Sequence, residues 1–108
     1  MALLHWKLQR ISAILLVPAI LYTVIYFLSI TQLTYPQIIS DITSFWGMVF
    51  IILTSVVLFT HSSLGIETIM EDYIHDDGMQ RFFITLSKLI HAILLIATLV
   101  SLMMIKGT

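Results

Sequence analysis

The residues best suited to chemistry follow one another within a single stretch of the chain. This stretch runs from His61 through Gly65 to the pair Asp72 and Tyr73. A neutral imidazole can bind a metal or a haem iron, carry protons or hydrogen-bond a neighbour. An aspartate can carry protons, and a tyrosine hydroxyl can donate a hydrogen bond to a carbonyl oxygen. The stretch therefore combines a candidate metal ligand with a candidate proton donor.

Helical spacing places three of these residues on one face. At about 100° per residue, Gly65 lies about 40° from His61 and Asp72 about 20° from it. A glycine one turn from a histidine leaves room for a flat macrocycle. The alternatives are a lone polar histidine satisfied by a neighbouring helix and ordinary small-residue packing. Small-residue packing explains the glycine, but not an acid that continues the same face.

Three residues at the ends of apolar segments, Arg10, Asp72 and Tyr73, have both a functional and a purely structural interpretation. Arg10 could form a bidentate contact with a carboxylate or a propionate, or it could anchor the chain at a membrane surface. Tyr73 could belong to an aromatic belt at the membrane surface, and Asp72 could be a helix-end acid. His91 is interpreted as a polar packing residue.

A divalent metal site is conceivable at Glu71 and His75, which lie four residues apart. It would require the helix to continue through both residues. The following Asp76, Asp77 and Gly78 instead predict a turn. A solvated loop is therefore the favoured interpretation of this segment.

The composition excludes several classes of protein. Of 108 residues, 59% are hydrophobic and 10% are charged, and the mean hydropathy is +1.05. So few charges cannot cover the surface of a small soluble enzyme. A net charge of −1 without a basic cluster argues against nucleic-acid binding, and zero cysteines exclude disulfides and thiolate-bound metals. A small integral membrane protein remains.

The charged residues leave three long apolar gaps. Crossing the hydrocarbon takes roughly 20 apolar residues in a helix, and lipid offers the backbone no other hydrogen-bonding partner. We therefore predict an all-α fold, an integral membrane bundle of three transmembrane helices at about residues 12–30, 45–70 and 82–105. Residues 1–108 then form a single membrane-anchor domain.

The basic residues predict the orientation of this bundle. Lys7 and Arg10 precede the first span, and Arg81 and Lys88 flank the connection between the second and third spans. Residues 31–44 contain no lysine or arginine. The positive-inside rule then places the N-terminus and the 70–81 connection on the cytoplasmic or matrix side.

These motifs resemble those of a known family. The chain is similar to the small hydrophobic membrane anchors of succinate dehydrogenase (respiratory complex II), which are its small cytochrome b-type subunits. The resemblance covers most of the chain, and its strongest part is the histidine–glycine–aspartate–tyrosine series inside three membrane spans. The motifs that carry it are Arg10-Ile11-Ser12-Ala13, Leu33-Thr34-Tyr35, His61-x3-Gly65, Asp72-Tyr73 and Arg81.

The resemblance implies a function and a role for each site residue. The protein would be a multi-pass subunit of the bacterial or mitochondrial inner membrane, acting in the respiratory chain and the tricarboxylic acid cycle. It would share a haem b with a second membrane anchor subunit, and His61 would be one axial ligand of the iron. Tyr73 and Asp72 would bind ubiquinone, and Arg10 would lie near the haem propionates. Succinate oxidation would belong to the flavoprotein subunit, and an iron–sulfur subunit would deliver the electrons.

The chain departs from the family in one respect, and two alternatives remain open. Glu67 and Glu71 make the end of the second span unusually acidic. The chain lacks the Arg-Pro and Ser-Pro-His motifs of the companion anchor in the same complex, so the small anchor is the better match. A haem-free anchor of the fumarate reductase type and a non-redox structural or assembly protein of the membrane are the alternatives.

Overall fold

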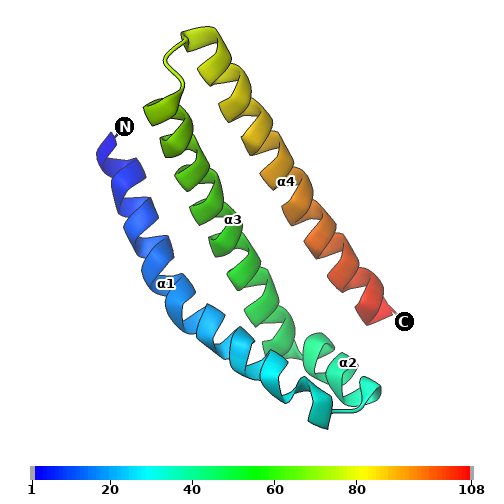
Figure 1. Cartoon of the computed structure of the whole chain (residues 1–108). Coiled ribbons are helices and arrows are strands. Elements are labelled where there is room, and N and C mark those ends of the chain that lie inside the picture. The colour runs from blue at the N-terminus through cyan, green and yellow to red at the C-terminus, as the bar shows by residue number, and fades with distance from the viewer. Residues whose placement is uncertain (1, 108) are drawn as a thin grey trace.

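The computed structural model describes residues 2–107, which are almost entirely helical and contain no strand (Figure 1). The three long helices are α1 (Ala2–Ser29), α3 (Phe45–Tyr73) and α4 (Asp77–Gly107). A 3₁₀ turn at Ile30–Gln32 and a short helix, α2 (Tyr35–Thr43), lie between α1 and α3. The predicted all-α class is confirmed.

Within residues 2–107, three helices are long and apolar enough to cross a membrane. Their most apolar segments have mean hydropathies of 2.3, 2.0 and 2.2 in chain order. The first and third helices begin earlier than the predicted spans, at Ala2 and Asp77. A helix need not end where the hydrocarbon does, because its hydrogen bonds are internal.

Helix α3 lies between α1 and α4 and packs against both (Figure 1). The molecule is elongated, with extents of 52 × 26 × 22 Å. Of the side chains that the structure describes, only Ser12, Leu16 and Leu102 are buried. Because so few side chains are buried, most of the apolar surface must face lipid or another protein.

Helix α1 continues through Pro18 and is curved along its length (Figure 1). Proline has no N–H to donate to the carbonyl four residues earlier, and its ring crowds that carbonyl. Bends of this kind are tolerated in membrane helices. Pro18, near the middle of the helix, therefore explains the curvature of α1.

Helix α2 occupies a segment for which the sequence predicts only a connection. It begins with a capping box, in which the Gln37 N–H donates to Thr34 Oγ1 at 3.3 Å and the Thr34 N–H donates to Gln37 Oε1 at 2.8 Å. Pro36 lies in the first turn, where no N–H is needed. Tyr26 of α1 donates its hydroxyl hydrogen to Asp41 Oδ2 at 2.8 Å, which ties α1 to α2.

The corner between α2 and α3 is built around a serine and a glycine. Ser44 Oγ accepts from the Gly47 N–H at 3.0 Å and donates to the Asp41 carbonyl at 2.8 Å. A Cβ atom added at Gly47 would collide with that same Asp41 carbonyl. The close approach of α2 and α3 therefore requires glycine at this position.

The predicted turn at Asp76–Gly78 is wrong in its extent. Residues 74–76 form the whole connection, and α4 already begins at Asp77. The physical reason is a side-chain cap, because Asp76 Oδ2 accepts from the Met79 N–H at 2.9 Å. Helix α3 ends at Tyr73, so Glu71 and His75 do not lie on one helix.

Replacing Gly47 with alanine should destabilise the α2–α3 corner, since the new methyl group meets a backbone carbonyl that cannot rotate away. We expect a loss of about 1–3 kcal/mol in the free energy of unfolding. Thermal unfolding in detergent measures it. Gly107→Ala is the control, because a Cβ atom there meets nothing within 4 Å. Equal melting temperatures for the two variants would contradict the prediction.

Candidate functional site

His61 of α3 lies against Ser12 of α1. His61 Nδ1 and Ser12 Oγ are 2.9 Å apart, and Ser12 is only 6% exposed. The pair joins two helices in the apolar part of the molecule. Few polar groups are available there, so the direction of this hydrogen bond determines the chemistry of the imidazole.

The direction follows from counting hydrogens. A serine hydroxyl has one hydrogen to donate and two lone pairs that accept. Ser12 Oγ is also 3.0 Å from the Gln9 carbonyl oxygen, which can only accept. Both contacts are satisfied when Ser12 donates to Gln9 and His61 donates Nδ1–H to Ser12. The Nε2 atom of His61 then carries the lone pair.

An open apolar groove lies beside this imidazole. It has a volume of about 470 Å³, and we call it the His61 groove. His61 is the only ionisable residue among those that line it, which are Ala13, Leu16, Val17, Ile20, Leu21, Leu58 and His61. An apolar wall with a single nitrogen donor suits a flat hydrophobic ligand that holds a metal ion.

Gly65, one turn after His61, is not required by the packing of this chain. A Cβ atom there would meet only Gln9 Nε2, at the ordinary contact distance of 3.6 Å. Its predicted role in leaving room for a macrocycle is therefore separate from the contact between α1 and α3.

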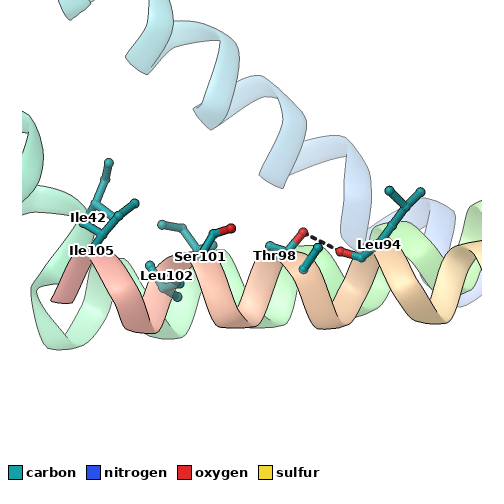
Figure 2. Close-up of a pocket in the computed structure, with 8 residues that line it drawn as sticks. Ile42, Leu94, Thr98, Ser101, Leu102 and Ile105 are labelled. Atoms are coloured by element: carbon teal, nitrogen blue, oxygen red, sulfur yellow. Dashed lines mark hydrogen bonds between the residues drawn. The ribbon is translucent and has the colours of Figure 1, made fainter. Parts of the chain in front are cut away.

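A second groove, the α4 groove, has similar size but no ionisable group (Figure 2). It measures about 420 Å³ and is lined by Ile42, Ile51, Leu94, Ala97, Thr98, Ser101, Leu102 and Ile105. The Thr98 hydroxyl donates to the Leu94 carbonyl of its own helix at 2.9 Å (Figure 2). The α4 groove thus offers an apolar surface without a metal ligand.

His91 of α4 differs from His61 because both of its ring nitrogens have partners. Nδ1 lies 2.7 Å from the Ser87 carbonyl, to which it can only donate. Nε2 is then the acceptor for the Ser62 hydroxyl of α3, at 2.9 Å. This arrangement agrees with the expectation that His91 is a polar packing residue.

Asp72 and Tyr73 are the last two residues of α3, and both are exposed, Tyr73 to 79%. They lie at the end of the molecule where α1 begins, α3 ends and α4 begins, which we call the Tyr73 end (Figure 1). In the described part of the chain, neither side chain is hydrogen-bonded to another residue. Both are therefore accessible to a ligand.

Arg10 of α1 is also exposed, and its guanidinium lies over the Trp6 ring, 5.2 Å from the ring centre. No hydrogen bond or ion pair within residues 2–107 joins it to His61, Asp72 or Tyr73. The structure therefore leaves the predicted site residues as separate groups on α1 and α3.

Sequence reasoning missed Ser12 and the surroundings of His5. Ser12 is a polar residue just inside an apolar span, and that signal could have identified it as a partner for a histidine in the same layer of the bundle. His5 Nε2 lies 3.2 Å from Thr68 Oγ1, and Glu67 and Glu71 are close to it. Spacing along the chain gave no signal for this second group, because its members come from two helices.

Comparisons with known proteins show the family of the chain. The family of succinate dehydrogenase/fumarate reductase transmembrane subunits matches residues 1–104. The chain is 37% identical over 90 residues to the succinate dehydrogenase membrane anchor subunit of Reclinomonas americana. That alignment covers 81% of this chain and 75% of the relative. No solved structure matches the chain.

The fold and the site define a three-helix membrane protein in which an imidazole faces an open apolar groove. The family match and the relative identify the complex to which such a protein belongs. The chain belongs to the succinate dehydrogenase/fumarate reductase transmembrane subunit family, as a membrane anchor subunit of succinate dehydrogenase.

Replacing Ser12 with alanine should release the Nδ1 proton of His61 from its acceptor. In the wild type we expect nitrogen-15 NMR of labelled histidine to report a protonated Nδ1 and an unprotonated Nε2. The variant should show a mixture of the two forms. Ser62→Ala is the matched control, since it removes the hydroxyl that bonds His91 and should leave the His61 signals unchanged. Identical His61 signals in Ser12→Ala and the wild type would disprove the hydrogen-bond direction.

Proposed function

We propose that this chain supplies one axial ligand of a haem b and part of the site where ubiquinone is reduced. The observation that carries the proposal is the state of His61. Its Nδ1–H is held by Ser12, its Nε2 keeps a lone pair, and the residue lines an apolar groove. Metal-bound histidines commonly have the second ring nitrogen fixed by such an acceptor.

The residues around His61 fit a haem. One imidazole nitrogen is available, the groove walls are aliphatic, and no acid or cysteine is among the residues that line the groove. Bound there, a haem b would supply one-electron redox chemistry. His61 would hold the iron through Nε2, and Arg10 would bind a propionate with its planar guanidinium. Because one imidazole fills one axial position, the other ligand would come from a second membrane anchor subunit.

The Tyr73 end supports a quinone site. Reduction of a quinone to a quinol takes two electrons and two protons, and negative charge develops on the carbonyl oxygen. The exposed Tyr73 hydroxyl would donate a hydrogen bond to that oxygen, and Asp72 would replenish the proton through water. The electrons would come from an iron–sulfur subunit and the succinate chemistry from a flavoprotein subunit. This chain would bind no succinate.

The distribution of basic residues supports the proposed orientation. Lys7 and Arg10 lie early in α1 and Arg81 early in α4, which places them toward the Tyr73 end, whereas Lys106 lies in the last turn of α4. The Tyr73 end would therefore face the cytoplasm of a bacterium or the matrix of a mitochondrion. That is the side on which the iron–sulfur and flavoprotein subunits would dock.

Replacing His61 with alanine should abolish the low-spin bis-histidine haem spectrum of the purified complex, because the iron loses one axial ligand. His75→Ala is the control, because it removes an exposed histidine outside the groove and should retain haem. An unchanged spectrum in His61→Ala would disprove the ligand assignment. Absence of haem from the wild-type complex would instead favour an anchor of the haem-free fumarate reductase type.

Replacing Tyr73 with phenylalanine should slow quinone reduction by about 10²–10⁴-fold, the usual contribution of a positioned proton donor. Succinate oxidation with an artificial electron acceptor should remain unchanged, since it bypasses the quinone. Tyr35→Phe is the matched control, because Tyr35 is also exposed, to 75%, but begins α2 at the opposite end. Equal quinone activity in both variants would argue against the assignment of Tyr73.

A further inference from the structure

Three side chains that the proposed function does not use converge near the Tyr73 end. His5 comes from the first turns of α1, and Glu67 and Glu71 lie one turn apart on α3. One ligand atom from each falls within 4.8 Å of the other two. His5 and Glu67 are partly buried, and Glu71 is exposed. An imidazole and two carboxylates are a donor set that divalent transition metals accept.

The protonation of His5 can be derived in the same way as that of His61. Thr68 Oγ1 lies 3.0 Å from the Leu64 carbonyl, to which it must donate its one hydrogen. The same oxygen lies 3.2 Å from His5 Nε2 and therefore accepts Nε2–H. The Nδ1 atom of His5 is left with the lone pair. Thr68 is thus the outer partner that a metal-bound histidine needs.

The charges in this cluster are unbalanced. Two carboxylates one turn apart on a helix repel each other. Lys88 Nζ lies 3.9 Å from Glu67 Oε1, but Lys88 is 59% exposed, and such surface pairs are weak. No lysine or arginine in the described part of the chain pairs with Glu71. A cation bound between the carboxylates would remove the repulsion.

We propose that His5 Nδ1, Glu67 and Glu71 form a binding site for a divalent cation of the zinc class. Three protein ligands leave one position for water in a tetrahedral zinc site. The bound cation would join the start of α1 to the end of α3, immediately before Asp72 and Tyr73. This proposal does not depend on haem or quinone binding, since none of its three ligands has a role there.

The experiment uses zinc and the purified complex in detergent. We expect one zinc ion that resists dialysis, with a zinc-edge X-ray absorption spectrum showing one imidazole nitrogen and oxygen ligands at about 2.0–2.2 Å. The method is specific for zinc, so iron in the complex does not interfere. His5→Gln and Glu71→Gln should abolish tight binding. Thr68→Val should weaken it by about 10–100-fold, the usual effect of losing an outer partner.

His75→Gln and Asp76→Asn are the matched controls, because both residues are near the same end of the molecule and neither belongs to the cluster. Both variants should bind zinc like the wild type. The haem spectrum of every variant should stay unchanged, which separates this proposal from the assignment of His61. Zinc affinity equal to the wild type in Glu71→Gln, or a loss of affinity in His75→Gln, would overturn the proposal, as would a wild-type complex without a tight zinc site.

Discussion

Hydrogen bonds between histidines and hydroxyl groups tie the three long helices together. His5 meets Thr68 and His61 meets Ser12 between α1 and α3, and His91 meets Ser62 between α3 and α4. Lipid is as apolar as a leucine side chain, so the hydrophobic effect does little to hold membrane helices together. Interhelical hydrogen bonds contribute on average about 0.6 kcal/mol each in such proteins. These three bonds also fix which residues of neighbouring helices lie side by side.

The three histidines differ in whether a ring nitrogen keeps a free lone pair after these bonds are made. His91 uses both ring nitrogens inside the chain and can do little besides hold α3 to α4. His61 and His5 each give one N–H to a hydroxyl whose own hydrogen is already donated to a backbone carbonyl. Each is left with a lone pair that a metal can use. The three histidines thus acquire different chemistry from the oxygen atoms next to their rings.

The sequence was sufficient to predict the three apolar helices and to single out His61, because absent charges and an isolated imidazole are local features. It did not predict α2, since nine residues with a proline resemble a loop until the Thr34 cap is seen. It also did not predict Ser12 or Thr68 as partners, because those contacts join residues 49 and 63 positions apart. Contacts between helices depend on their rotation and axial position, which a charge pattern does not specify.

Under the proposed function, the ring nitrogens with a free lone pair also indicate where a second membrane anchor subunit would lie. A haem shared with that subunit would need a second ligand from it, so the subunit would approach the His61 groove between α1 and α3. The α4 groove has no ionisable residue, and both ring nitrogens of His91 already have partners, so α4 offers no ligand for that haem. The exposed apolar surface of α1, which includes Ile14, Leu15 and Val17, would then be covered by protein rather than by acyl chains. Under the proposed function, the two sides of α3 therefore differ: the side with α1 keeps a free histidine lone pair and would face the partner subunit, whereas the side with α4 keeps none.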